Sequence, residues 1–518
     1  MTTYDEPAFE RFCSDLVADG FSPVSGTDRR EWVGPIRPSL QALTEQTRMK
    51  VEFYPGWPLR YAHVFVRGMR AEHASQGLVC LWAEDDPAQI SARELSGLWG
   101  RIDEWAEAAL RGFSVSDRAL DAYYLYDEVG SFRAELPFLD LVQRGNNGFV
   151  ADLRAVVSAT GLVSIESEGH EFGERVTLTG LFLLRNHLDP IPTDLEAVLS
   201  SLTSRQRATV ERALNDRGAF GVGERSGGLD FLVLAWPRHE REHDALVIMF
   251  AGAGNSIQSV AMPATANDVR SRRRRAGGDA DALSDKNVLM VGAGSVGGNV
   301  ALGLASSGVG RLTVCDSDVL STGNLVRHVN GAHLVGYPKV QGLKLTIGDH
   351  APWTEVTWLP DVPLDPELLS QAVAGYNMVV DCTGLFSVAG ALADVCESAD
   401  IPLVNVTLFH EGRLARVQRQ VPGDPSIASR ALDRRFVVPP PAEADALSPG
   451  FLELGCTAPV NNASPLAVVA AAADAADLAV DFLTGRVARA CERYLVFRSM
   501  DAPFEHLGTI DYPVEDDT

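Results

Sequence analysis

Three glycines and one acid in the second half of the chain have the types and spacing of a nucleotide-binding site. Gly292, Gly294 and Gly297 follow an apolar run in GxGxxG spacing. Glycine lets the backbone approach a phosphate or a ribose closely, and a helix that begins there adds a positive field. Asp316 stands roughly 20 residues further on, where a carboxylate can bind ribose hydroxyls. Alone, this spacing predicts a nucleotide site, with a dinucleotide as the default ligand.

A second series of residues changes the expected ligand. Asn324-Leu-Val-Arg327 follows the acid, then comes Pro-Lys339, and a later apolar run ends on Asp381-Cys-Thr. In this order the residues resemble the adenylation domain of ubiquitin-activating enzymes and of their bacterial relatives in thiamine and molybdopterin biosynthesis. The resemblance covers roughly residues 262–500. It implies that ATP, rather than NAD, occupies the site.

The resemblance also implies a role for each of these side chains. Arg327 and Lys339 would bind the phosphates of ATP with the help of Asn324, and Asp316 would bind the ribose. Asp381 would hold Mg²⁺, a hard cation that prefers carboxylate and phosphate oxygens. When a carboxylate attacks the α-phosphate, charge builds on that phosphate and on the departing pyrophosphate. The reaction therefore depends on cations, metal and positioning more than on proton transfer.

A basic run stands ahead of the glycines and has two interpretations. It consists of Arg270 and residues 272–275, followed by Ala-Gly-Gly-Asp. The run could supply a further phosphate ligand. A solvated charged surface at a linker is the more common structure for such a run.

Cys456 is the first candidate nucleophile. It follows Gly455 and precedes an alanine-rich helix, at the place where the crossover loop of activating enzymes carries their nucleophilic cysteine. A thiolate attacks an acyl-adenylate readily, because sulfur is nucleophilic near neutral pH. The alternative is a buried cysteine that packs as a small hydrophobic residue.

Cys80 is the second candidate, in Gly77-Leu-Val-Cys80-Leu. A helix near residues 8–17, alternating strands within 49–65 and a helix near 95–109 surround it. This order resembles ubiquitin-conjugating enzymes over residues 1–115, with Cys80 at their active-site cysteine. Their His-Pro-Asn triplet is absent. His73 stands nearby and could assist the reaction, or it could be a surface histidine; Cys80 itself could be a strand cysteine of an unrelated α+β domain.

The elements that must position these residues follow from the apolar pattern. Runs at 288–291, 312–315 and 378–381 predict buried parallel strands, whose carboxyl ends meet at one edge of a sheet. The predicted fold class is α/β. A Rossmann-like adenylation domain spans residues 262–518, an α+β conjugating-enzyme-like domain spans 1–115, and a mixed α/β connecting domain spans 116–261. The expected elements outside the site are strands at 176–184, 231–236, 245–250, 402–408 and 414–419, and helices at 195–202 and 465–483.

Composition narrows the cellular setting. The net charge of −24 disfavours nonspecific binding to nucleic acid or to an anionic membrane. The sequence has no apolar run of about 18 residues, and its N-terminus lacks the pattern of a signal peptide. The seven cysteines include no CxxC pair. This pattern fits a reducing cytosol, so we expect a cytoplasmic protein.

Together these patterns predict an enzyme that adenylates the C-terminal carboxylate of a small protein with ATP and Mg²⁺. Cys456 would take the acyl group as a thioester, and Cys80 would pass it to an amine of an acceptor protein. Fusions of this order resemble bacterial antiviral conjugation proteins, including those of cyclic-oligonucleotide (CBASS) signalling. The resemblance implies a ubiquitin-like protein or a nucleotide cyclase as substrate, and a homodimer formed through the adenylation domain.

Three alternatives from other classes stay open at this point. A sulfur-carrier-protein adenylyltransferase would need no Cys80 domain. A dinucleotide-dependent oxidoreductase would use the same glycines, but Arg327 and Lys339 would then be unexplained. A non-catalytic scaffold would retain the fold without turnover.

Overall fold

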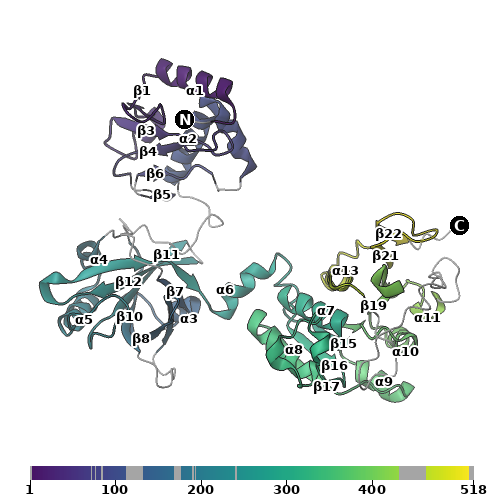
Figure 1. Cartoon of the computed structure of the whole chain (residues 1–518). Coiled ribbons are helices and arrows are strands. Elements are labelled where there is room, and N and C mark those ends of the chain that lie inside the picture. Colours follow the sequence, from purple (N-terminus) through teal and green to yellow (C-terminus); the bar gives the residue numbers. More distant parts are fainter. Residues whose placement is uncertain are drawn as a thin grey trace. The chain divides into compact units, whose positions relative to one another are not determined.

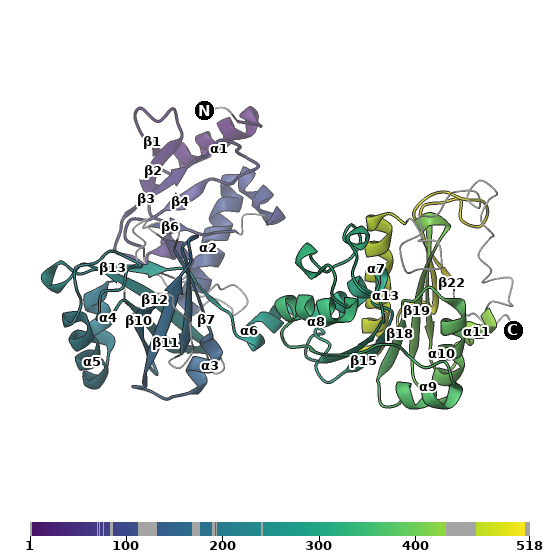
Figure 2. The same cartoon turned by 60° about the horizontal axis from the view of Figure 1, so that its bottom comes forward.

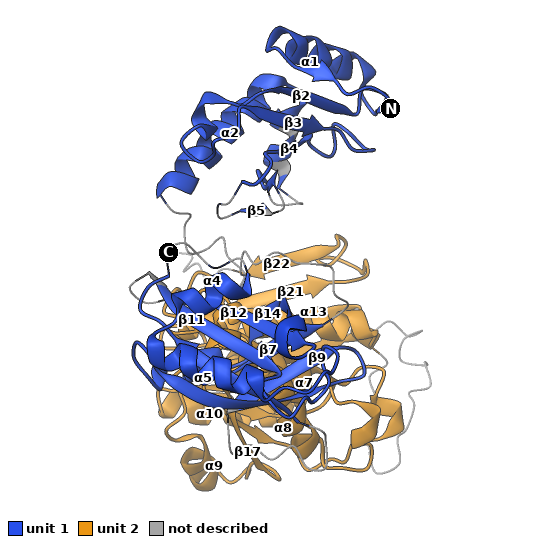
Figure 3. Cartoon of the chain, turned by 90° about the vertical axis from the view of Figure 1, so that its left-hand side faces the viewer, with its two compact units in different colours: residues 1–268 blue, residues 269–518 orange. Residues whose placement is uncertain are grey.

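The chain forms two compact units, residues 1–268 and 269–518 (Figure 3). The computed structural model describes residues 3–69, 71, 73–75, 77–82, 86–111, 132–167, 177–188, 192, 194–239, 242–430 and 463–512. Within these residues lie three β-sheets, two in the first unit and one in the second (Figure 1). Among the helices described, none combines the length and apolar character needed to cross a membrane.

The first sheet is antiparallel and packs against two helices. Its order is β1-β2-β3-β4-β6-β5. The helices are α1 (Glu6–Ala18), which the carboxylate of Asp5 caps, and α2 (Leu95–Arg111). The strands are β1 (Ser22–Pro23), β2 (Glu31–Pro35), β3 (Arg48–Glu52), β4 (His63–Phe65), β5 (Ala74–Ser75) and β6 (Leu78–Val79).

The second of the alternating strands expected within 49–65 is shorter than the pattern, which begins at Leu59, because β4 begins only at His63. The residues before it form turns around Trp57, which is fully buried. The Trp57 ring packs edge-on against Phe9 and Phe53, with ring centroids 5.7 Å apart in both cases. Burial of this large ring therefore overrides the alternating pattern.

The second sheet is mixed and has a core on each face. Its order is β13-β12-β11-β10-β8-β9-β7-β14. One core includes Val210 and Leu214 of α5 (Ser204–Asn215), and the other includes Phe138 and Leu141 of α3 (Phe138–Gln143). The other elements are β7 (Arg133–Leu136), β8 (Val150–Val157), β9 (Leu162–Ser167), β10 (Leu178–Leu184), α4 (Leu195–Ser201), β11 (Phe231–His239), β12 (Glu242–Ala251), β13 (Gln258–Met262) and β14 (Ala264–Ala266).

The third sheet is the Rossmann-like one, and its order is β17-β16-β15-β18-β19-β20-β21-β22. The strands from β17 to β19 are parallel, and the strands from β19 onward pair antiparallel. The strands are β15 (Asn287–Val291), β16 (Arg311–Cys315), β17 (Glu355–Leu359), β18 (Met378–Asp381), β19 (Leu403–Phe409), β20 (Leu414–Gln420), β21 (Glu492–Val496) and β22 (Gly508–Tyr512). The predicted α/β class is thereby confirmed.

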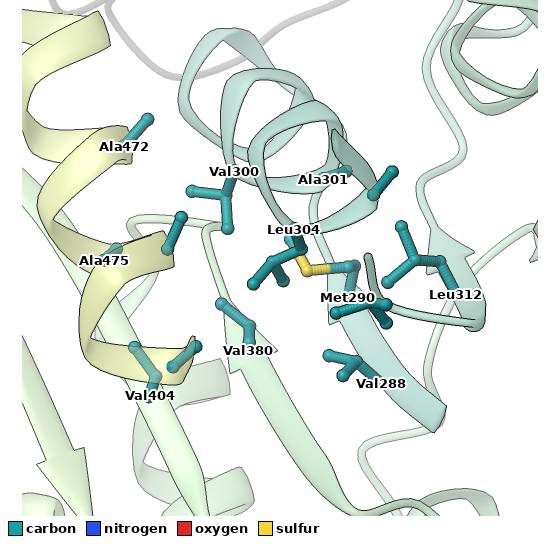
Figure 4. Packing of buried hydrophobic residues seen from close by; sticks show 14 of the residues in the cluster. Val288, Met290, Val300, Ala301, Leu304, Leu312, Val380, Val404, Ala472 and Ala475 are labelled. Carbon is teal, nitrogen blue, oxygen red and sulfur yellow. The ribbon is translucent and has the colours of Figure 1, made fainter. Parts of the chain in front are cut away.

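Helices cover both faces of this third sheet (Figure 2). On one face lie α7 (Ser295–Ser306), α8 (Lys339–His350) and α13 (Pro465–Leu483), and on the other lie α9 (Pro366–Val373), α10 (Phe386–Ser398) and α11 (Ile427–Arg430). Figure 4 shows Val288 and Met290 of β15 in one core with Val300 and Leu304 of α7. A Cβ on Gly303 would lie only 3.4 Å from Cβ of Ala476, so small residues let α7 and α13 approach closely.

Two arginines of the basic run before the glycines bind backbone carbonyls of the second unit. Arg272 donates to the backbone carbonyl of Asp349 (2.8 Å) at the end of α8. Arg273 donates to the carbonyls of Ala280 and Gly308, at 2.8 Å each, the latter just beyond the end of α7. Cations at helix C-termini interact favourably with the helix dipole. A 12-residue helix is about 18 Å long, so Arg273 lies far from the glycines at the other end of α7.

The boundary between the two units falls after Asp268, whereas we predicted a domain boundary at residue 262. Residue 262 ends β13, and β14 still belongs to the second sheet. The three-domain assignment itself stays a prediction.

Candidate functional site

The glycine turn joins β15 to α7 and leaves one position open to a ligand. Gly292 has a φ of +92°, and a Cβ there would lie 3.1 Å from the backbone carbon of Cys382. A Cβ on Gly297 would lie 1.9 Å from the carbonyl oxygen of Gly292. A Cβ on Gly294 would meet no atom within 4 Å. Gly292 and Gly297 are therefore required by the fold, and Gly294 borders the space where a ligand can approach.

Asp316 connects the end of β16 to this turn. Its Oδ2 accepts a hydrogen bond from the backbone N–H of Ala293 at 2.7 Å, and its Oδ1 accepts one from the N–H of Asp318 at 2.8 Å. A carboxylate has about four acceptor sites, so two of them remain for ribose hydroxyls. The structure brings Asp316 to the glycine turn, as the ribose role requires, and the role itself stays a prediction.

Lys339 begins α8, and its ammonium pairs with Asp318. Nζ lies 2.7 Å from Oδ2 of Asp318, and the backbone N–H of Lys339 donates to the carbonyl of Asp318 at 2.9 Å. The Lys339 side chain is only 11% exposed, whereas that of Asp318 is 58% exposed. A phosphate that binds Lys339 must therefore share this ammonium with Asp318.

Asn324 and Arg327 lie on the loop between Asp316 and Lys339. The side-chain oxygen of Asn324 accepts a hydrogen bond from the N–H of Ser321 at 3.0 Å, which fixes the turn before Arg327. The carbonyl of Arg327 accepts a hydrogen bond from Nδ2 of Asn299 in α7, at 3.4 Å. This loop is thereby joined to the helix that carries the glycines.

Asp381 ends β18 and is fully buried. Its Oδ1 accepts from the N–H (2.9 Å) and the hydroxyl (2.7 Å) of Thr383, and its Oδ2 accepts from Nδ2 of Asn405 (2.9 Å). Burial raises the pKa of Asp381, and these three hydrogen bonds oppose that rise. Asn405 lies beside Asp381 on β19 in the parallel register.

These residues fit a magnesium ion that is held mainly by a nucleotide. Asp381 uses three of about four acceptor sites, so Oδ2 can supply one ligand. Within the described residues, no group of three or more His, Cys, Asp or Glu side chains could hold a metal ion. Magnesium is commonly bound by one or two carboxylates together with phosphates and water. Asp381 would thus be the ligand from the chain, with phosphate oxygens and water completing the coordination.

His328 and Asn330 were not predicted as site residues, although the structure joins both to the site. Nε2 of His328 lies 2.8 Å from the carbonyl oxygen of Ala293 in the glycine turn. Burial lowers the pKa of His328. The only signal in the sequence is that His328 directly follows Arg327.

Cys80 is exposed and lies at the base of the β5–β6 hairpin. Its backbone N–H donates to the carbonyl of His73 at 2.8 Å. His73 has a φ of +55°, which places it in the left-handed region at the start of the hairpin. Gly77 also has a positive φ, and a Cβ there would lie 2.7 Å from the carbonyl oxygen of Val66. The structure therefore brings His73 and Cys80 together through the backbone.

The chemical surroundings of Cys80 disfavour its thiolate. Desolvation raises the pKa of the Cys80 thiol. Burial and the charge of Cys80 raise the pKa of the neighbouring Tyr61, whose ring packs against Trp82 at 4.8 Å between centroids. The catalytic roles of Cys80 and His73 stay predictions.

Cys456, the predicted first nucleophile, lies outside the described residues, as does the rest of its expected loop. The described chain on either side is well anchored. Arg430 is 1% exposed, and it donates to Glu492 (2.9 Å) and to the carbonyl of Arg419 (2.6 Å). Ser464 caps α13 by accepting the N–H of Ala467 at 3.2 Å. Cys13, Cys315, Cys396 and Cys491 are buried, as is typical of cysteines that pack as small hydrophobic residues.

The parallel strands, the glycine turn and the acids at the strand ends define a Rossmann-like domain with the geometry of a nucleotide site. Residues 270–507, which are less than half of the chain, match the model of the ThiF family.

Curated relatives match part of the chain. It is 34% identical over 142 residues to the molybdopterin-synthase adenylyltransferase of Salmonella typhimurium, a match that covers 27% of this chain and 54% of the relative. It is 37% identical over 161 residues to the protein of the same name in Escherichia coli, covering 30% of this chain and 62% of the relative. The chain therefore spans between half and two thirds of the length of these relatives.

A solved structure of the microcin C7 biosynthetic enzyme MccB, in complex with N-formylated MccA, is 18% identical. The match covers 45% of this chain and 66% of that chain, with a TM-score of 0.35.

Proposed function

We propose that the chain is an enzyme that uses ATP to adenylate the C-terminal carboxylate of a small protein. The observation that carries this proposal is the arrangement of the glycine turn, Asp316 and the loop of Arg327 and Lys339 at one edge of the third sheet. This arrangement lies within the residues that match the ThiF family. The two molybdopterin-synthase relatives carry the name adenylyltransferase, which further supports the proposal.

In this proposal the chain's residues bind and orient the reactants. The backbone at Gly294 and the N-terminus of α7 receive phosphate charge, because unpaired N–H groups and the helix dipole favour an anion there. Arg327 and Lys339 place positive charge where negative charge develops on the phosphates. Asp381 is the ligand for magnesium, which would neutralise phosphate charge when bound. A carboxylate oxygen of the small protein attacks the α-phosphorus, an acyl–phosphate bond forms, and pyrophosphate leaves.

We further propose that the acyl group then passes through two thioesters. The thiolate of Cys456 attacks the acyl-adenylate and AMP leaves, and the thiolate of Cys80 then displaces Cys456. An amine of an acceptor protein finally attacks the Cys80 thioester, which forms an amide and releases the thiol. The exposure of Cys80 supports this role, because a relay cysteine must meet both a donor and an acceptor.

The identity of the partners rests on the resemblance. The small protein would be a ubiquitin-like protein or a nucleotide cyclase, and the setting would be bacterial antiviral defence. A homodimer through the adenylation domain and a cytoplasmic location belong to the same proposal.

A second candidate function is adenylation of a sulfur-carrier protein without conjugation. The names of the two relatives favour it. This function gives no role to the exposed Cys80, so a Cys80 variant separates the two candidates.

Thermal unfolding tests the choice of nucleotide. A ligand that binds only the native state raises the melting temperature by mass action. ATP with Mg²⁺ should raise the melting temperature of the full chain, and NAD should leave it unchanged. Stabilisation by NAD without stabilisation by ATP would overturn the adenylation proposal in favour of an oxidoreductase.

A further inference from the structure

The buried side chain of His328 bridges the Arg327 loop and the glycine turn. Its Nδ1 accepts a hydrogen bond from the N–H of Asn330 at 3.1 Å. Because Nδ1 is an acceptor, Nε2 must carry the proton in the neutral ring, and it donates to the carbonyl of Ala293 at 2.8 Å. His328 is only 8% exposed. The ring is therefore held in one tautomer by two backbone groups.

Asn330 continues this connection to α8. Its Nδ2 donates to the carbonyl of Lys339 at 3.1 Å, and its Oδ1 accepts from the hydroxyl of Thr346 at 3.1 Å. A Cβ on Gly342 would lie 2.5 Å from Nδ2 of Asn330, so a glycine is needed to admit this amide. A continuous line of hydrogen bonds thus runs from Ala293 through His328 and Asn330 to Lys339.

Packing against α7 reinforces the connection. A Cβ on Gly298 would lie 3.4 Å from Cε1 of His328 and 3.2 Å from Cγ2 of Val329. The loop therefore rests directly on the first turn of the helix that follows the glycines. Asn299, one residue further along α7, holds the carbonyl of Arg327.

We propose that His328 and Asn330 are positioning residues that fix Arg327 and Lys339 relative to the glycine turn, so that both cations meet the phosphates of ATP. This inference rests on the proposed function, because that function makes Arg327 and Lys339 phosphate ligands. Charge stabilisation works best when the charged groups are already in place, and a displacement of about 1 Å can cost about 100-fold in rate. Buried polar links of this kind specify one arrangement, which apolar packing alone would not.

Variants at His328 separate its two contacts. In His328→Gln, the side-chain amide can still donate to Ala293. In His328→Asn, the shorter amide can still accept from the N–H of Asn330. His328→Leu removes both hydrogen bonds and puts an apolar side chain of similar size in place of the imidazole. Asn330→Ala keeps the backbone N–H that donates to His328 and removes the side-chain hydrogen bonds to Lys339 and Thr346.

The measurement is calorimetric binding of ATP with Mg²⁺ to the full chain, together with the melting temperature of each variant. His328→Leu should weaken ATP binding about tenfold or more, His328→Gln should recover most of the affinity, and Asn330→Ala should give an intermediate loss. Thr354→Val is the matched control, because the buried Thr354 donates to the carbonyl of Val309 at 2.7 Å in the same domain. It should lower the melting temperature without weakening ATP binding.

The outcomes distinguish this inference from the function on which it rests. A wild-type chain that binds no ATP would overturn the proposed function and this inference with it. A wild-type chain that binds ATP, with His328→Leu and Asn330→Ala binding equally well, would overturn only the inference. If His328→Leu fails to fold, unchanged affinity in both Asn330→Ala and His328→Asn would have the same meaning.

Discussion

The nucleotide site and the Cys80 hairpin are built in opposite ways. At the nucleotide site, the side chains of Asp316, His328 and Asp381 each form hydrogen bonds with neighbouring backbone groups, and Asp381 is fully buried. At the hairpin, each strand is only two residues long, and Cys80 directly follows the second strand. Its thiol is exposed, and desolvation raises the pKa of that thiol. The first site is organised before any ligand arrives. Under the proposed function, the second would need a partner that favours the thiolate of Cys80 before the thiol reacts.

This difference matches the chemistry proposed for each region. Adenylation requires positive charge at fixed places around a phosphate, and fixed charges are most effective when they need no reorganisation. Acyl relay requires a nucleophile that two different partners can reach. A relay cysteine that stays protonated until a partner arrives is also protected from wasteful reactions.

The largest effect is expected from Asp381→Asn, which should impair the nucleotide site and leave the Cys80 hairpin intact. Loss of the carboxylate should lower partner-dependent pyrophosphate exchange by about 100-fold or more, as removal of one electrostatic contact to the reacting groups does elsewhere. An amide has nearly the size of the carboxylate, and its oxygen can still accept both hydrogen bonds from Thr383, so the chain should still fold. Asp394→Asn, on the exposed side of α10, is the control. Pyrophosphate exchange that survives in Asp381→Asn would show that Asp381 is not the magnesium ligand.

Cys80→Ala should impair acyl transfer at the hairpin and leave the nucleotide site intact. Pyrophosphate exchange and the thioester on the second unit should remain, while transfer to the acceptor protein should stop. Gel analysis with and without reductant shows both products, and Cys13→Ala, in the buried face of α1, is the control. Unimpaired acceptor modification by Cys80→Ala would make the N-terminal region a binding module and favour the sulfur-carrier type of function.

A pair of glycine variants sharpens the distinction between fold and ligand within the nucleotide site. Gly297→Ala places a Cβ 1.9 Å from the carbonyl of Gly292, so it should destabilise the chain by about 1–3 kcal/mol. Gly294→Ala meets no atom within 4 Å and has a negative φ, so it should keep the stability. Its methyl group should nevertheless weaken ATP binding about tenfold, or 1.4 kcal/mol. Equal ATP affinity in Gly294→Ala and wild type would show that the phosphates lie elsewhere.

The smallest effect concerns the pH dependence of Cys80. A raised thiol pKa means less thiolate near neutral pH than in a free cysteine, so alkylation of Cys80 should be slow at pH 7 and rise with pH to above pH 9. The rate is measured with iodoacetamide and peptide mapping, and a short peptide thiol serves as the reference. Faster alkylation of Cys80 than of the peptide at pH 7 would contradict the proposal that Cys80 stays protonated until a partner binds.

Local signals predicted much of the third sheet. The apolar runs at β15, β16 and β18 are buried parallel strands, and Gly292 and Gly297 are required by close backbone contacts. The apolar runs themselves and the contact of Gly297 with Gly292 involve residues that are close in sequence, so a pattern can reveal them.

The missed features depend on residues that are distant in sequence. Asp381 is held by Asn405, 24 residues later, and Arg272 caps a helix end 77 residues away. Asn330 acquires its role only because Gly342 in α8 leaves room for its amide. No spacing rule within one element could indicate such pairs. The late start of β4 at His63 likewise reflects the burial of Trp57.

Pyrophosphate–ATP exchange tests the central claim most directly. The full chain is incubated with ATP, Mg²⁺, labelled pyrophosphate and a ubiquitin-like protein or nucleotide cyclase encoded beside its gene. The account predicts label in ATP when that protein ends in a free carboxylate, and no label when its C-terminus is an amide. Exchange that proceeds equally with the amide, or a chain that binds ATP yet shows no exchange with any carboxylate-ended candidate, would contradict the claim that this site activates a C-terminal carboxylate.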